Sequence, residues 1–202
     1  IKCINNDVFI DNCKFNSNKA DGNGGVIYIE HVGGQLVINN CQFINNSATE
    51  GLAIYGIESA GELFLKKSIF NDNNVDTNTQ YVIEVSNYKI NIENMNVTFS
   101  STDNACGGIR INNKGEININ NSLFFRTKSA TGSICYSPST ESTIDNYLSI
   151  NKCKFIQTSG GGLYIDTQTG SMEIITIQGN EFFECTFYEK QFTSIGSGLT
   201  TD

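Results

Sequence analysis

The chain contains almost no proline, histidine or tryptophan. Pro138 is the single proline in 202 residues, His31 is the single histidine, and tryptophan is absent. Proline cannot donate to a sheet ladder, so its scarcity is compatible with long runs of paired strands. A lone histidine is more often structural than catalytic, and no motif places a Ser-His-Asp or Cys-His arrangement around it. These absences favour a β-rich protein over a nucleophilic hydrolase.

Basic residues and long apolar runs are also scarce. Thirteen Lys and Arg stand against 21 Asp and Glu, giving a net charge of −8, and the basic residues do not cluster. Nucleic-acid binding needs a basic footprint, so we do not expect that partner. No run of 18 apolar residues exists, and no membrane span is predicted. Because the chain begins at Ile1 without a signal peptide, we expect residues 1–202 to be one domain of a longer protein.

Metal-binding patterns are missing as well. The seven cysteines contain no Cys-x-x-Cys pair, which disfavours a zinc framework. No Asp-Asp or Asp-x-Asp run is present, so a calcium cluster is not predicted either. We therefore expect neither a metal nor another cofactor.

Asparagine and glycine are abundant instead. The chain holds 27 Asn and 19 Gly, and both residues tolerate a left-handed backbone, so the chain is expected to turn often and tightly. Three Asn-x-Ser/Thr sequons make Asn45, Asn96 and Asn120 candidate glycosylation sites if the protein passes through a secretory pathway.

A short apolar segment ending in phenylalanine recurs along the whole chain. The spacings between successive anchors are 28, 27, 29, 25, 31 and 27 residues. The anchors are Phe15, Phe43, Phe70, Phe99, Phe124, Phe155 and Phe182. A period of 20 to 50 residues built from short alternating segments is typical of a solenoid.

A second apolar segment follows a small-residue turn in each repeat, as in residues 24–29, 107–111 and 161–165. Apolar residues alternate in both segments, which is the period of a strand. The same turn chemistry recurs at the same phase, and two-residue hairpin turns are scarce. The sequence therefore predicts an all-β fold, a right-handed single-stranded parallel β-helix of about seven coils with about 28 residues each.

The first segment of each repeat contains a bend. Around Asn39 and Asn40 the apolar alternation changes phase, and stacked Asn at such a bend can form an amide ladder between coils. Two residues before the Phe anchor, Cys13 and Cys41 are expected to be stacked neighbours. They are a candidate disulfide, and buried free thiols are the alternative.

One row of the second segment is predicted to face outward. It contains Glu84 beside Arg110, for which we expect an ion pair. Tyr28, Tyr55 and Tyr164 lie in the same row and are candidate ligand-facing aromatics, able to stack on sugar rings or anchor a protein. The alternative is that these tyrosines only stack on neighbouring coils.

Two motifs share each early repeat. Gly-Gly-Val-Ile occupies 24–27, and Phe-x-x-Asn occupies 15–18, 43–46 and 70–73. This pairing resembles the polymorphic outer-membrane protein repeats of chlamydial autotransporters. Thr102, Thr158 and Cys185 replace the Asn in later repeats. The resemblance implies a right-handed β-helix that is displayed on a cell surface and used in adhesion.

These features together predict a non-enzymatic, extracellular structural or adhesive surface module. Its expected partners are other copies or neighbouring segments placed end to end, and carbohydrate or a host or cell-surface protein. A polysaccharide-binding or polysaccharide-degrading β-helix is one alternative, and degradation would need two carboxylates facing each other across a groove. A self-assembling extracellular filament is another, because the end coils of a solenoid have unpaired edges.

Overall fold

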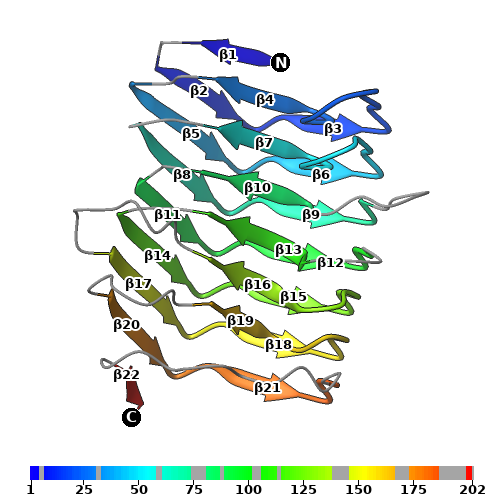
Figure 1. Ribbon diagram of the computed structural model, residues 1–202. Coiled ribbons are helices and arrows are strands. Elements are labelled where there is room, and N and C mark those ends of the chain that lie inside the picture. The colour runs from blue at the N-terminus through cyan, green and yellow to red at the C-terminus, as the bar shows by residue number, and fades with distance from the viewer. Residues whose placement is uncertain are drawn as a thin grey trace.

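The chain folds as a parallel β-solenoid in the computed structural model (Figure 1). The structure describes residues 1–4, 7–30, 33–57, 61–73, 81–86, 89–101, 106–112, 115–137, 146–166, 173–186 and 199–201. His31, Thr102 and Pro138 lie outside these residues. Strands are the only regular secondary structure in the described ranges.

Three parallel sheets, here called sheets A, B and C, form the faces of the solenoid. Sheet A contains β1 (Lys2–Ile4), β4 (Ile27–Glu30), β7 (Ile54–Ile57), β10 (Ile83–Val85), β13 (Cys106–Ile111), β16 (Gly132–Tyr136) and β19 (Leu163–Ile165). Sheet B contains β2 (Val8–Asp11), β5 (Gln35–Asn39), β8 (Glu62–Lys66), β11 (Lys89–Glu93), β14 (Glu116–Asn120), β17 (Asn146–Asn151), β20 (Glu173–Gln178) and β22 (Leu199–Thr201). Sheet C contains β3 (Lys14–Asn16), β6 (Gln42–Ile44), β9 (Ile69–Asn71), β12 (Asn96–Thr98), β15 (Leu123–Phe125), β18 (Lys154–Ile156) and β21 (Glu181–Phe183).

Each strand pairs with its equivalent in the next repeat. Leu36, for example, pairs with Val8 on one side and with Leu63 on the other. The predicted parallel β-helix is thus confirmed. The sheets hold seven, eight and seven strands, and the extra strand, β22, extends sheet B alone. The number of coils therefore differs slightly from the predicted seven.

The fourth repeat corrects one predicted anchor. Val97, and not Phe99, pairs with Phe70 and Phe124 and occupies the inward position. Phe99 lies two residues later and is 46% exposed. With Val97 as the anchor, the spacings become 28, 27, 27, 27, 31 and 27 residues. Phe99 continues the aromatic pattern of the other anchors, but the alternation of the strand places Val97 inward.

The core is a continuous column of inward side chains. In sheet C, the rings of Phe43 and Phe70 stack with centroids 4.5 Å apart, and Phe15 stacks on Phe43 at 5.0 Å. Further along, Phe155 stacks on Phe124 at 5.1 Å. Full burial of one such side chain contributes about 1.5–3 kcal/mol. The interior is therefore filled with apolar side chains, so any binding or catalytic site must lie on the outer faces of the sheets.

The bend between sheets B and C carries the predicted ladder. Asn12, Asn40 and Asn121 adopt positive φ there, which asparagine tolerates better than most residues. Asn39 Nδ2 donates to Asp11 Oδ1 at 2.7 Å, and Asn40 Nδ2 donates to Asn12 Oδ1. These bonds run from coil to coil and hold the bend in register.

A second amide ladder, not anticipated from the sequence, explains the Phe-x-x-Asn motif. Asn46 Oδ1 accepts from Asn18 Nδ2 at 2.9 Å, and Asn46 Nδ2 donates to Asn73 Oδ1 at 3.1 Å. The same Asn46 amide donates to the Phe15 carbonyl oxygen at 3.2 Å. Asn46 and Asn73 are fully buried. The motif thus provides hydrogen-bond partners for buried backbone groups at the ends of the sheet C strands.

Candidate functional site

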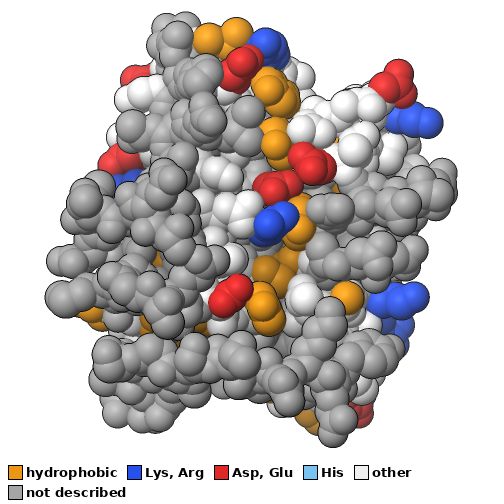
Figure 2. Space-filling view, viewed as in Figure 1, with side chains coloured by type: hydrophobic (Ala, Val, Ile, Leu, Met, Phe, Trp, Pro, Cys, Tyr) orange, Lys and Arg blue, Asp and Glu red, His pale blue; other side chains and the backbone are white. Residues whose placement is uncertain are grey.

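One row of outward side chains crosses all seven strands of sheet A. We call it the sheet A band, and its members lie in register on successive strands: Lys2, Tyr28, Tyr55, Glu84, Arg110, Cys135 and Tyr164. Figure 2 shows charged and hydrophobic side chains gathered down the middle of the molecule, over the strands labelled β4 to β16 in Figure 1. The predicted outward row is confirmed in its register.

The first part of the band is aromatic. Tyr28 and Tyr55 stack with ring centroids 5.8 Å apart, and Lys2 Nζ lies 5.6 Å from the Tyr28 ring centroid. Burial and the nearby Glu50 carboxylate raise the pKa of Tyr55 to about 12. Tyr164 is 36% exposed, but three strands, β10, β13 and β16, separate it from this pair. The structure therefore brings together two of the three candidate aromatics.

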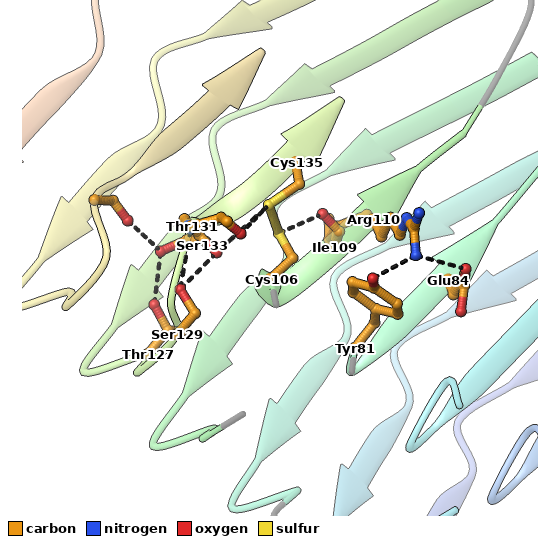
Figure 3. Close-up of a disulfide and its surroundings, with 12 residues drawn as sticks. Tyr81, Glu84, Cys106, Ile109, Arg110, Thr127, Ser129, Thr131, Ser133 and Cys135 are labelled. Atoms are coloured by element: carbon orange, nitrogen blue, oxygen red, sulfur yellow. Dashed lines mark hydrogen bonds and ion pairs between the residues drawn. A yellow bond between two sulfur atoms is a disulfide. The ribbon is translucent and has the colours of Figure 1, made fainter. Parts of the chain in front are cut away.

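The centre of the band is a charged cluster that the sequence predicted in part. Arg110 Nη1 lies 3.5 Å from Glu84 Oε1, which is the expected pair, and it also donates to the Tyr81 hydroxyl (Figure 3). Arg110 Nε donates to Asn112 Oδ1 at 2.8 Å, and Asn112 Nδ2 donates to Glu84 Oε1 at 3.3 Å. Tyr81 and Asn112 were missed, because neither belongs to the row itself.

Glu84 is buried although it faces outward. It is 7% exposed, and its Oε2 has no hydrogen-bond partner among the residues that the structure describes. Burial raises the pKa of Glu84 to about 7, while Arg110 opposes the shift and Glu50 adds to it. The cluster is therefore a packed polar network with one carboxyl that titrates near neutrality.

A disulfide lies beside this cluster and corrects the predicted pairing. Cys106 and Cys135 are joined across β13 and β16, with Cα atoms 5.9 Å apart, and Tyr81 packs beside them (Figure 3). A one-residue bulge after Cys106 shifts the register of β13 against β16. Sequence alternation alone does not reveal such a bulge, so these two cysteines were left unpaired.

Cys13 and Cys41, the predicted pair, are free thiols. Each is turned toward the backbone of its own bend. Cys13 Sγ donates to the Asp11 carbonyl oxygen at 3.3 Å, and Cys41 Sγ donates to the Asn39 carbonyl oxygen at 3.2 Å. Their role in the structure is that of small core side chains, which was the alternative interpretation.

The three sequons occupy different surroundings. Asn45 is exposed at a turn with positive φ, whereas Asn96 and Asn120 are half-buried on strands. The hydroxyl residue of the third sequon, Ser122, is buried and donates to the Asn120 carbonyl oxygen at 3.0 Å. Asn45 is thus the most accessible acceptor, and glycan attachment at all three sites stays a prediction.

Within the described part of the chain, no three potential metal-ligating side chains gather at one place. The same residues include no helix long and apolar enough to cross a membrane. No family model, curated protein or solved structure matches this chain.

Proposed function

We propose that the chain is a rigid, non-enzymatic module of an extracellular surface protein, with a structural or adhesive role. The observation that carries the proposal is the Cys106–Cys135 disulfide between two neighbouring coils, set beside the sheet A band. Disulfides persist in oxidising compartments and are rare in the cytosol. A covalent link between coils is also the kind of support that a load-bearing surface rod requires.

The surroundings of Glu84 support a non-enzymatic role. A general acid must reach its substrate directly or through one water molecule. Glu84 Oε1 is held by Arg110 and Asn112, and the whole side chain is nearly enclosed. Glu50 is the acidic residue whose charge raises the pKa of Glu84, and it accepts a hydrogen bond from Asn23 Nδ2 at 3.0 Å. These carboxyl groups serve the packing between coils, which favours a scaffold over a glycosidase or lyase.

End-to-end contacts fit the same role. At the last coil of sheet C, one face of the Phe182 ring stacks on Phe155 with centroids 4.8 Å apart, and Phe182 and Phe183 are both exposed. A further coil, from a neighbouring segment or from another copy, would extend the aromatic stack. Adhesion to carbohydrate or to a cell-surface protein is then the task of the outer faces.

The test is non-reducing peptide mapping of native material that is alkylated at collection. We expect Cys106 and Cys135 in one disulfide-linked pair of peptides, with Cys13 and Cys41 alkylated as free thiols. Enzymatic glycan removal before the mapping should lower the mass of the peptide that contains Asn45. Native material in which both Cys106 and Cys135 are alkylated would contradict the extracellular assignment.

A further inference from the structure

The outer face of sheet B is hollowed along its length. Two adjoining grooves, of about 490 and 440 Å³, share Phe64 and Lys66 and so form one continuous depression, here called the sheet B furrow. It runs across strands from β2 to β20 and reaches the bend toward sheet C at Asn121 and Lys152. The sheet A band does not contribute to it.

The furrow has an apolar half and an amide half. One row of outward residues begins with Phe9, Val37 and Phe64 and continues in register with Asn91 and Asn118. Phe9 is 70% exposed, which is unusual for a phenylalanine. The parallel row along the bend adds further amides, which line the 490 Å³ groove: Asn120, Asn151 and Gln178.

The amides of the furrow retain unused hydrogen-bonding capacity. Asn118 Nδ2 donates to Glu116 Oε1 at 3.0 Å and to Asn91 Oδ1 at 3.4 Å. Asn151 Nδ2 donates to Ser149 Oγ at 2.7 Å and to Asn120 Oδ1 at 3.3 Å. An amide offers two donors and an acceptor with two lone pairs. Asn91 Nδ2 and Asn118 Oδ1 form no hydrogen bond within the described ranges, whereas the unpartnered Asn151 Oδ1 is buried and not open to a ligand. The furrow therefore presents donors and acceptors together.

The charges that line the furrow cancel. Lys66 and Lys152 are balanced by Asp11 and Glu93, although the chain as a whole has a net charge of −8. A furrow with balanced charges gives a polyanion no net electrostatic attraction. A polycation would be attracted more strongly to other, negatively charged parts of the surface. A ligand that matches the furrow carries no net charge and combines apolar faces with both donors and acceptors.

We propose that the sheet B furrow binds an extended, neutral polysaccharide chain. Sugar hydroxyls act as donor and acceptor at once, which matches the amide half. The C–H faces of sugar rings stack on aromatic rings at the surface, here the exposed Phe9 and the half-buried Phe64. Neighbouring coils are spaced ~4.8 Å apart, so equivalent side chains recur at regular intervals along the furrow. A polymer with a repeating unit could contact them one after another. The proposal rests on the surface role argued above and names its ligand class.

The experiment is calorimetric titration of the purified chain with neutral hexasaccharides of β-1,4-linked glucose, mannose and N-acetylglucosamine, and with a hexagalacturonate as the charged comparison. We expect at least one neutral hexasaccharide to bind with a Kd below about 1 mM. Phe64→Ala, and separately the double variant Asn91→Ala/Asn118→Ala, should each raise that Kd about tenfold or more.

Matched controls keep the test sharp. Phe99→Ala and Asn16→Ala remove an exposed ring and an exposed amide outside the furrow, and both should leave the Kd unchanged. All variants are checked for wild-type melting before titration. The proposal is overturned if no neutral hexasaccharide binds, if only the galacturonate binds, or if Phe64→Ala binds as wild type does. A chain with the mapped disulfide and no glycan binding would lose this proposal while keeping the surface assignment.

Discussion

The two halves of the solenoid fill the same turn position with different side chains. In residues 1–73, the position three after the inward aromatic is always asparagine, and these asparagines form a ladder. In residues 89–166 the position three after the inward residue (Val97, Phe124 or Phe155) holds Ser100, Thr127 and Thr158, all of them buried. The repeat therefore requires a small polar side chain at this position, and asparagine, serine and threonine all meet that requirement.

The consequences for hydrogen bonding differ between the halves. The Asn46 amide bonds to the coils on both sides of it. Among the described residues, Thr127 Oγ1 has one hydrogen-bond partner, Ser133 Oγ, at 2.6 Å. Thr158 Oγ1 has no partner within the described ranges. The disulfide lies in this second half, between β13 and β16. At this turn position, amide bonds link the coils of the first half, whereas the second half has hydroxyl groups there and carries the disulfide on sheet A.

The largest effect should come from breaking the aromatic stack of the first half. Phe43→Ala removes a ring that has an aromatic neighbour on both sides, and it should cost about 3–5 kcal/mol of unfolding free energy. Phe124 has Val97 on one side, so its truncation should cost less. Urea unfolding measures both, with Phe99→Ala as an exposed control. A Phe43→Ala variant with an unchanged midpoint would break the assigned register.

Removing the disulfide should weaken the second half more than the first. Cys106→Ser with Cys135→Ser opens a loop closed across a sequence separation of 29 and should cost about 2–4 kcal/mol. Cys13→Ser changes a free, half-buried thiol and serves as the control. Hydrogen exchange should show protection lost mainly in β13, β16 and β19. Equal loss in β3 and β6 would mean that the two halves unfold as one unit.

Glu84 stands near the junction of the halves and should make stability depend on pH. Its folded pKa of about 7 lies above the ordinary 4.5, so its contribution is complete below pH 4.5 and is lost as pH rises through 7. We expect up to about 3 kcal/mol less stability at pH 8.5 than at pH 4.5 from this group.

The Glu84→Gln variant isolates that contribution, because glutamine keeps the shape and cannot ionise. Its unfolding free energy should vary less between pH 4.5 and 8.5 than that of the wild type. Glu116→Gln is the control of opposite sign, since Lys89 holds the pKa of Glu116 below its usual range. An identical pH profile for Glu84→Gln and wild type would show that Glu84 ionises freely in the fold.

The smallest expected effect separates the two turn chemistries directly. Asn46→Ala deletes a buried amide that bonds on both sides, and it should cost about 2 kcal/mol. Thr127→Ala deletes one hydroxyl contact and should cost about 1 kcal/mol. Thermal unfolding of the pair gives the difference. Equal losses would mean that the ladder adds no more than a single hydroxyl does.

The fold could be predicted because its physical cause is periodic. Apolar alternation and the turn at Asn39 and Asn40 recur in every coil, so they locate the strands and the bend. The prediction failed at Val97, where a β-branched residue replaces the ring and an exposed Phe99 two positions later imitates the pattern. The inward and outward alternation of the residues on both sides identifies Val97 as the inward position.

The site was less predictable, since it depends on departures from the period. The Glu84–Arg110 pair follows from register alone, and sequence analysis found it. The Cys106–Cys135 bond requires a bulge that shifts one strand, and the sheet B furrow depends on depth, which a linear pattern does not encode. Side chains outside the repeated rows, such as Tyr81, are visible only in three dimensions.

The covalent link between β13 and β16 also has a mechanical consequence. A solenoid pulled by its ends comes apart like a zipper, because each coil is held only by the coil beside it. Peeling that starts at β21 releases one coil after another until it reaches Cys135, where the tension passes through sulfur to Cys106. The segment between Cys106 and Cys135 is then shielded from the load and cannot lengthen, so the disulfide limits how far the chain can be drawn out from that end.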